Sequence, residues 1–340
     1  MTRRRLGALV TPLFADSLRT PRGLLFVTFP AHSLPPLFFP AMSQSLKIHI
    51  DGQLLDQADA KISVFDHGLL YGDGVFEGIR FYNDRVFRLD EHIDRLYDSA
   101  KAIHLTIPIS KSEMEAAVLE TIRANDLHDG YIRLVITRGV GGLGLSPYRC
   151  EKASVIVIAS TIALYDPEVY EKGLKLVTCS TRRPSHDTLS PAVKSLNYLS
   201  NVMAKIEAIA GDADEGVMLN AAGYVAECTG DNIFVVKNGI IYTPPVHAGA
   251  LNGITRKVVI ELARARGYEL VETEMSRYEL YTADELFLTG TAAEVVPVRV
   301  YDERVIGNGD PGPITRQLLA GFVEITQSTG TPIYEAAVVS

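Results

Sequence analysis

The chain is organised around the stretch Leu189-Ser-Pro-Ala-Val-Lys194-Ser-Leu-Asn-Tyr198-Leu-Ser-Asn-Val-Met-Ala-Lys-Ile-Glu-Ala208. Lys194 carries the one charge in the run from Leu189 to Ala204, and Tyr198 follows four residues later. An amine among apolar and small neighbours gives up its proton easily, and its free lone pair can form a Schiff base with a carbonyl. On this window alone, a solvated lysine at the start of a helix is the simpler interpretation, so the rest of the chain has to decide.

We expect an amphipathic helix to follow the lysine. Ser195 or Ser190 can serve as its N-cap, and Gly211 is a natural end. We favour Ser195 as the cap, which leaves Lys194 just before the helix with Tyr198 about one turn away.

Length and composition exclude several classes of protein. At 340 residues the chain exceeds one ordinary hydrophobic core, so two domains are expected. A net charge of −8 argues against a nucleic-acid-binding surface, and no uninterrupted apolar run is long enough to span a bilayer. Cys150, Cys179 and Cys228 include no Cys-x-x-Cys spacing. They predict reduced thiols in a cytoplasmic protein rather than a disulfide framework or a metal site.

Residues 1–41 have a different composition, with five arginines against the single acid Asp16 and prolines that break every apolar run. An arginine-rich organelle transit peptide fits this composition, and a secretory signal fits it less well. We favour translation from Met42 and expect residues 1–41 to be a disordered N-terminal extension.

A small N-terminal α/β domain is expected over residues 46–162. It opens on Lys47-Ile-His-Ile-Asp-Gly52, an alternating strand that turns on Asp-Gly, and continues into a glycine-rich bend over 68–78. Asp90 is expected to cap a helix, and a second helix is expected from Lys111 to Asn125. Strands are predicted at 131–139 and 154–159.

Two arginines of this domain each have two interpretations. Arg95 lies on the first helix, where it either pairs with Glu91 one turn back or clamps an anion. Arg133 lies in an apolar strand, where burial is costly unless the guanidinium meets an anionic ligand or a structural carboxylate.

Residues 161–167 are a candidate linker to a larger C-terminal domain over 168–340. Residues 215–245 are expected to form a meander of antiparallel strands, with a turn at Asn238-Gly239. Within the meander, Glu227 stands among small and apolar residues, where a carboxylate needs a cation or a donor. Helices are expected from about Ile254 to Gly267 and over 313–327.

Two Gly-Thr turns in this domain offer sites for a phosphate. Gly253-Ile254-Thr255 begins a helix and so presents free backbone N–H groups, and Gly290-Thr291 follows a strand. A Schiff-base lysine, an acid for a pyridinium, a hydroxyl donor and a phosphate site are together what a pyridoxal phosphate enzyme requires of its protein.

From about Leu46 to its end, the chain resembles the class IV (fold type IV) pyridoxal phosphate aminotransferases, and most closely the branched-chain amino acid aminotransferases. Seven segments in order carry the resemblance: FDHGLLYGDGVFEGIR (65–80), EHIDRL (91–96), YIR (131–133), KSLNYL (194–199), ECTGDNIF (227–234), LNGITR (251–256) and TGTAAE (289–294). It implies a two-domain α+β (mixed α/β) fold with pyridoxal 5′-phosphate at the domain interface.

The resemblance also implies a role for each matching residue. Lys194 would be catalytic, as the cofactor-bound lysine and proton shuttle, and Glu227 would pair with the pyridine nitrogen. The cofactor would be held by Arg95, Lys194, Tyr198, Glu227, Leu251, Gly253, Ile254, Thr255 and Thr291. The substrate would be bound by Tyr71, Phe76, Arg80, Tyr131, Arg133, Thr291 and Ala292.

The implied activity is reversible amino transfer between L-leucine, L-isoleucine or L-valine and 2-oxoglutarate, within amino-acid biosynthesis. The partners would be amino acids, 2-oxo acids and a second copy of the chain, which completes the pocket in a homodimer or a higher homo-oligomer. D-amino acid aminotransferase and aminodeoxychorismate lyase share this fold and lysine. A pyridoxal phosphate-binding protein without activity is the alternative from another class. A Rossmann dehydrogenase is disfavoured because no glycine fingerprint lies between a strand and a helix.

Overall fold

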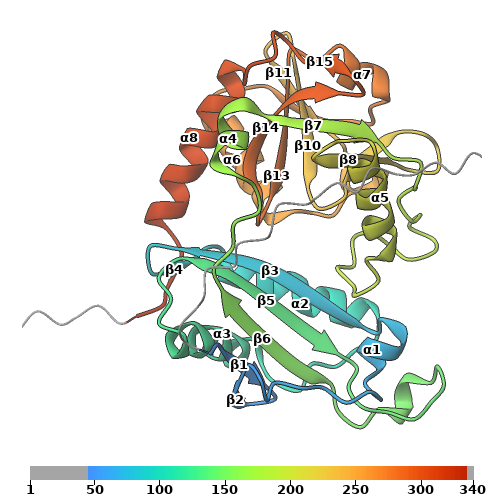
Figure 1. Cartoon of the computed structure of the whole chain (residues 1–340), viewed down its shortest axis with the longest axis vertical. Helices are drawn as coiled ribbons and strands as arrows, with labels where there is room; N and C mark the ends of the chain where they lie inside the picture. Colours follow the sequence, from blue (N-terminus) through green and yellow to red (C-terminus); the bar gives the residue numbers. More distant parts are fainter. Residues whose placement is uncertain (1–44, 335–340) are drawn as a thin grey trace, which may run out of the picture. The chain divides into compact units, whose positions relative to one another are not determined.

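The computed structural model describes residues 45–334, so the predictions for residues 1–41 lie outside the described part of the chain. The described residues form two sheets and the helices that cover them (Figure 1). The predicted mixed α+β class is confirmed.

The first sheet has seven strands in the order β16-β4-β3-β5-β6-β1-β2, with every neighbouring pair antiparallel. The bounds are β1 Lys47–Ile50, β2 Gln53–Asp56, β3 Gly74–Tyr82, β4 Arg85–Val86, β5 Gly130–Thr137, β6 Ser154–Ser160 and β16 Thr331–Pro332. Helices α2 (Leu89–Ala102) and α3 (Lys111–Ala124) pack on it, and Leu96, Ile122 and Ile132 are fully buried between them. The short helix α1 (His67–Tyr71) precedes β3.

The second sheet has nine strands, in the order β12-β11-β10-β13-β14-β7-β8-β9 with β15 paired to β14. The bounds are β7 Leu174–Thr178, β8 Glu215–Leu219, β9 Val225–Cys228, β10 Asn232–Lys237, β11 Ile240–Thr243, β12 Leu270–Glu272, β13 Glu285–Gly290, β14 Glu294–Tyr301 and β15 Arg304–Val305. Its helices are α4 Pro167–Lys172, α5 Leu199–Ala210, α6 Ile254–Ala265, α7 Arg277–Tyr281 and α8 Pro313–Ser328.

Apolar side chains cover this second sheet on both faces. Helices α6 and α8 pack on the face that carries the stacked rings of Phe234 and Phe287, whose centroids are 4.9 Å apart. Phe322 of α8 also packs edge-on against Phe87, which follows β4 of the first sheet. The two sheets therefore share part of one apolar core.

The strands follow the predicted division of the chain with one exception. Residues 161–166 carry no helix or strand and join β6 of the first sheet to α4. After α8, however, the chain returns to the first sheet, where β16 pairs with β4. The domain boundaries at 46–162 and 168–340 stay a prediction.

Three local predictions are wrong, and pairing with other strands explains two of them. Helix α5 begins at Leu199 without a side-chain cap, because Ser195 is held in a bridge to Val75. Helix α2 begins one residue before Asp90, with Arg88 at the N-cap. Residues 215–245 form two separate hairpins, because β10 pairs with β13 and not with β9.

Other local predictions are confirmed. The hairpin of β1 and β2 turns on Asp51-Gly52, and that of β10 and β11 turns on Asn238-Gly239. All four turn residues have positive φ, as a two-residue hairpin loop of this type requires. The helix bounds at 111–124 and 313–328 lie within one residue of those expected.

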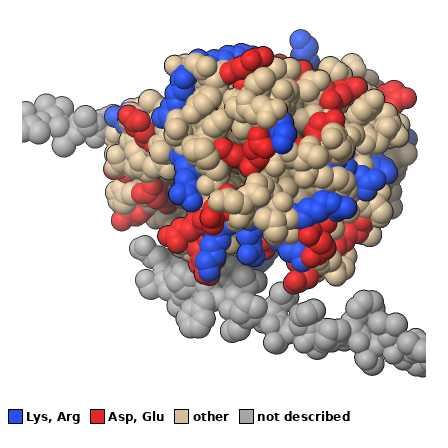
Figure 2. All heavy atoms as spheres, turned by 90° about the horizontal axis from the view of Figure 1, so that it is seen from above, with Lys and Arg blue, Asp and Glu red and all other residues tan. Residues whose placement is uncertain are grey.

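The distribution of surface charge and the length of the helices agree with the expectations drawn from the composition. Acidic and basic side chains are interspersed on the face shown in Figure 2, which has no broad basic patch. Among residues 45–334, no helix combines the length and the apolar character needed to cross a membrane.

Candidate active site

The Lys194 segment pairs with the first residues of β3, on the side where β4 covers only the end of that strand. The Phe76 N–H donates to the Lys194 carbonyl at 3.0 Å, and the Leu196 N–H donates to the Gly74 carbonyl at 2.9 Å. The Lys194 N–H in turn donates to the Ser99 hydroxyl of α2 at 3.2 Å. This pairing explains why Ser195 does not cap a helix, and it fixes the backbone from which the lysine side chain extends.

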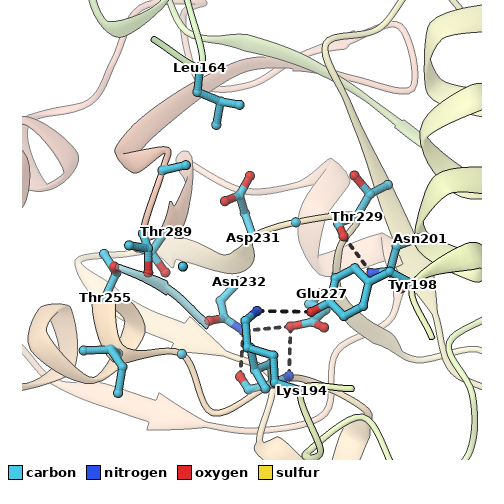
Figure 3. Close-up of a pocket in the computed structure, with 18 of the residues that line it drawn as sticks. Leu164, Lys194, Tyr198, Asn201, Glu227, Thr229, Asp231, Asn232, Thr255 and Thr289 are labelled. Carbon is cyan, nitrogen blue, oxygen red and sulfur yellow. Dashed lines mark hydrogen bonds between the residues drawn. The ribbon is translucent and has the colours of Figure 1, made fainter. Parts of the chain in front are cut away.

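The lysine side chain enters a cavity of about 380 Å³ (Figure 3). Its amine donates to the Tyr198 hydroxyl at 3.2 Å and lies 4.6 Å from the centroid of the Phe76 ring. Most of the predicted site residues line the same cavity: Phe76, Arg95, Tyr131, Arg133, Lys194, Tyr198, Glu227, Leu251, Gly253, Ile254, Thr255, Thr291 and Ala292.

One end of the cavity presents the carboxylate of Glu227, on β9. Its Oε2 accepts hydrogen bonds from the Leu251 N–H at 2.9 Å and the Asn232 amide at 3.0 Å (Figure 3), and the Arg183 guanidinium lies 2.7 Å from Oε1. Burial raises the pKa of the Glu227 carboxyl above its ordinary value and outweighs the opposing effect of Arg183. The carboxylate therefore needs these donors to stay charged.

Arg183 was not predicted as part of the site. It is buried behind Glu227, and it also donates to the Gly249 carbonyl and to Asn201. The only signal in the sequence was the requirement of Glu227 for a cation. The tandem Arg182-Arg183 does not reveal which guanidinium is buried, and Asn232 gave no signal beyond its place in the same motif.

The other end of the cavity presents Arg95, on α2. Its Nε donates to Glu77 Oε1 at 2.7 Å, its Nη2 to Glu77 Oε2 at 2.8 Å and its Nη1 to the Asn252 carbonyl at 2.7 Å. The alternative pairing of Arg95 with Glu91 is wrong, because Glu91 pairs with Arg88 and Lys257 instead. Arg95 faces the cavity, where it can meet an anion.

The first turn of α6 lies near this end. Gly253 is its N-cap, and the backbone N–H groups of Ile254 and Thr255 have no acceptor within the helix. A Cβ on Gly253 would lie 2.1 Å from Asn232 Oδ1, so only glycine allows the helix start to approach the Asn232 side chain. Free N–H groups and the positive end of the helix dipole favour a phosphate at this position.

A buried hydroxyl on β13 also lines this cavity. Thr289 is fully buried, and its Oγ1 has no hydrogen-bond partner among residues 45–334. Thr255 lines the same cavity, and both side chains are labelled in Figure 3. Because a buried hydroxyl without a partner is costly, the position indicates a missing ligand group. Thr289 was not predicted as a site residue, and its motif singled out only the Gly290-Thr291 turn.

Aromatic rings and Arg133 form the wall near β3. The Arg133 guanidinium lies 4.8 Å from the centroid of the Phe76 ring and 5.5 Å from that of Tyr131. Within the described residues it has no ion pair, so the alternative of a structural carboxylate is wrong. A Cβ on Gly78 would lie 2.0 Å from the Tyr131 hydroxyl, which explains the glycine there.

Two predicted substrate residues lie outside this cavity. Arg80 pairs with Glu294 at 3.4 Å, and Glu294 also accepts from the Tyr82 hydroxyl at 2.9 Å. Tyr71 lies on the exposed helix α1, where its hydroxyl accepts from the Gly144 N–H. Neither side chain reaches the cavity of its own chain.

The cavity therefore has an anionic end, an end rich in donors, and an amine with an adjacent hydroxyl between them. A flat heterocycle with a cationic nitrogen and a phosphate matches this order of charges. The amine can bond covalently to a carbonyl and can carry a proton.

Comparisons with known proteins agree with this geometry. Residues 74–301 match the family described as Amino-transferase class IV. A Methanocaldococcus jannaschii protein, named provisionally as a branched-chain-amino-acid aminotransferase, is 54% identical over 85% of this chain and all of its own length. The Pseudomonas aeruginosa branched-chain-amino-acid aminotransferase is 42% identical over 82% of this chain and 92% of its own.

Solved structures of branched-chain amino acid aminotransferases also resemble this chain. The T.th. branched-chain amino acid aminotransferase with pyridoxamine 5′-phosphate superposes with a TM-score of 0.80 at 40% identity, over 84% of this chain and 95% of its own. The same enzyme has also been solved with N-(5′-phosphopyridoxyl)-L-glutamate.

Proposed function

The chain belongs to the class IV aminotransferases and, within them, to the branched-chain amino acid aminotransferases, and on this premise we propose how its own residues perform the reaction. It is a pyridoxal phosphate-dependent transaminase. The observation that carries the assignment of roles is that Lys194 and Glu227 line one cavity, with Arg95 and the start of α6 at its other end. The relatives at 40–54% identity bear names of branched-chain-amino-acid aminotransferases, which favours this activity over that of a D-amino acid aminotransferase or an aminodeoxychorismate lyase of the same fold.

The residues of the cavity fit the cofactor. Glu227 would accept a hydrogen bond from the pyridine nitrogen, and Leu251 would pack on the ring. Arg95, the N–H groups of Ile254 and Thr255, and the Thr291 hydroxyl would hold the phosphate. The Thr289 hydroxyl, which lacks a protein partner among the described residues, adds a donor that a phosphate oxygen can satisfy.

When bound, pyridoxal phosphate supplies a carbonyl for the amino group and a ring that accepts electrons from the substrate Cα. Lys194 holds and then releases the cofactor. Its amine would take the proton from the substrate Cα and carry it for the transfer that the cofactor makes possible. Glu227, held ionised by Arg183, keeps the ring nitrogen protonated. The Tyr198 hydroxyl accepts a hydrogen bond from the Lys194 amine at 3.2 Å and so orients it, and it would donate to the phenolic oxygen of the ring.

The wall near β3 would select the substrate. Tyr131, Arg133 and the Thr291-Ala292 turn would orient the carboxylate, and the Phe76 ring would contact the branched side chain. In the return reaction, the same groups would orient the corresponding carboxylate of 2-oxoglutarate; no protein carboxylate within the described residues pairs with Arg133. Amino acid and 2-oxo acid exchange one amino group and one carbonyl oxygen, so the two half-reactions balance.

We propose a homodimer as the working unit. Helix α5 exposes five apolar side chains: Leu199, Val202, Met203, Ile206 and Ile209. Apolar residues spaced along one helix face are costly in water, and a second copy would cover them. Tyr71, exposed and outside its own cavity, would then be free to contact the second copy. Light scattering should give about twice 37.2 kDa; a monomer with full activity would refute the dimer.

We also propose that the enzyme acts in the cytoplasm. Cys150, Cys179 and Cys228 are all free thiols, as a reducing compartment maintains. Fractionation of cells that express the native gene checks the location, and recovery in an organelle would contradict it.

A substrate panel tests the activity. Purified protein with 2-oxoglutarate should transfer the amino group of L-leucine, L-isoleucine and L-valine but not of D-alanine, and should release no pyruvate from aminodeoxychorismate. Borohydride reduction of the holoprotein should place the cofactor mass on the peptide that contains Lys194, and Lys194→Ala should abolish both turnover and this label. Turnover by Lys194→Ala, or a label on another lysine, would refute the assignment.

A further inference from the structure

Behind Arg95 lies a buried network of two residues that do not touch the cavity. Glu77 of β3 is fully buried and His92 of α2 is nearly so. His92 Nδ1 lies 2.8 Å from Glu77 Oε2, the same oxygen that accepts from Arg95 Nη2. The Glu77 carboxylate thus receives three hydrogen bonds from two side chains of one helix.

The charges of this network determine which group donates. Burial alone would raise the pKa of Glu77, but Arg95 and His92 outweigh it and bring the pKa to about 2. Because the carboxyl group carries no proton at neutral pH, His92 Nδ1 must be the donor. A carboxylate that accepts from both side chains has little freedom to rotate, so it fixes the plane of the guanidinium.

The position of Glu77 links Arg95 to the lysine. Glu77 directly follows Phe76, whose N–H donates to the Lys194 carbonyl. Strand β3 therefore sets the backbone of Lys194 through one residue and the guanidinium of Arg95 through the next. The distance between the amine and the phosphate site is defined by one rigid strand.

Arg95 also has competing partners outside the cavity. It lies in the wall between the cavity and an outer groove lined by Glu91, Asp94 and Asp98 of its own helix. Glu91 and Asp94 are already paired with lysines. Asp98, one turn after Arg95, has no ion pair among the described residues and is within reach of a released guanidinium.

We propose that Glu77 and His92 are positioning residues for the cofactor phosphate, which hold the Arg95 guanidinium turned into the cavity and away from Asp98. The inference rests on the proposed function and deepens it. Arg95 acts as an oriented donor rather than as an excess positive charge, because Glu77 neutralises it. The removal of Glu77 therefore weakens phosphate binding, although it makes the site more positive.

Equilibrium binding to the apoprotein tests this, with pyridoxal phosphate and phosphate-free pyridoxal as probes. Glu77→Gln should weaken pyridoxal phosphate binding about 30-fold or more, as truncation of a buried charge pair does, and should change pyridoxal binding less than about 3-fold. His92→Leu should weaken pyridoxal phosphate about 10-fold, and His92→Asn, whose amide replaces Nδ1–H, should restore most of that loss. Glu91→Gln, on the outer face of the same helix, is the matched control.

The double variant Glu77→Gln with Asp98→Asn tests the competition. Removal of the outer acid should recover part of the lost affinity for pyridoxal phosphate. If Glu77→Gln does not fold, as judged by circular dichroism, the comparison of His92→Leu with His92→Asn decides the question.

Three outcomes would overturn the inference: an equal loss for both probes, tighter pyridoxal phosphate binding by Glu77→Gln, or no difference between the two His92 variants. Failure of the unmodified chain to bind pyridoxal phosphate would instead refute the proposed function.

Discussion

Each end of the cavity has an arginine paired with a glutamate, but the two ends differ in which of the two lines the cavity and which is buried behind it. At the end proposed to hold the phosphate, Arg95 lines the cavity and the buried Glu77 pairs with it; at the end proposed to meet the ring nitrogen, Glu227 lines the cavity and the buried Arg183 pairs with it. These two ends are called the phosphate end and the ring-nitrogen end after the proposed roles. The residue in front determines which charge the end accepts. The buried residue of each pair, Glu77 or Arg183, orients the charged group that lines the cavity and shifts its pKa.

The two carboxylates differ in pKa because their surroundings differ. Glu77 receives a bidentate guanidinium and an imidazole, which overcome the cost of burial. Glu227 receives one guanidinium contact and two neutral donors, and burial prevails. The ring-nitrogen end is therefore incompletely stabilised without a ligand, and a protonated ring nitrogen would supply the missing positive charge.

The largest expected effect is at the front residue of the ring-nitrogen end. Glu227→Gln keeps the shape and an acceptor for the Leu251 N–H but removes the anion opposite the ring. We expect kcat to fall by about 10²–10³-fold while pyridoxal phosphate stays bound, because the ring nitrogen loses its proton. Steady-state kinetics with an absorbance scan measure this. A kcat within tenfold of that of the unmodified enzyme would contradict the role of the Glu227 carboxylate.

The second effect is on stability, at the back residue of the phosphate end. Since folding lowers the pKa of Glu77 from 4.5 to about 2, its contribution is complete above pH 4.5 and is lost as the pH falls toward 2. That contribution is roughly 3 kcal/mol. Urea unfolding of the apoprotein from pH 6 to pH 3 should show the difference between the native chain and Glu77→Gln shrinking with acid; a constant difference would contradict this.

The third effect tests whether Arg183, buried behind Glu227, keeps that carboxylate ionised. In Arg183→Gln, burial acts on Glu227 without the opposing guanidinium, so the pKa of Glu227 rises further. Because the reaction uses the carboxylate, the acid limb of the kcat profile should move to higher pH. Activity at pH 7 should fall about 10–100-fold and recover partly as the pH rises. Arg182→Gln, at an exposed neighbour, is the control. An equal loss at every pH would indicate a structural role only.

The smallest effect concerns the buried Thr289 hydroxyl, which lines the cavity. Thr289→Val preserves shape and removes a group without a protein partner among the described residues, so the apoprotein should be as stable as the native chain or slightly more stable. Pyridoxal phosphate affinity should fall about 3–10-fold. Thermal melting and a binding titration separate the two; a loss of apoprotein stability would show that the hydroxyl has a protein partner.

The sequence was enough to predict the charged residues that line the cavity but not their buried partners, and the reason is physical. Lys194, Glu227 and the start of α6 carry their chemistry in short local segments. Arg183 and Glu77 act through contacts that only the packing of distant elements creates. The same cause explains the wrong cap at Ser195, because pairing with β3 overrides the local preference. Tyr71 and Arg80 matched a motif, yet only the fold could show that they lie outside the cavity.

The most direct test of the roles proposed for the Arg95–Glu77 and Glu227–Arg183 pairs is a crystal structure of the protein with pyridoxal phosphate. We predict that the phosphate lies against Arg95 and the first turn of α6, that the ring nitrogen lies within hydrogen-bond distance of Glu227, and that the Lys194 amine is bonded to the cofactor. A phosphate located at the Glu227 end, or a cofactor bound outside this cavity, would contradict it.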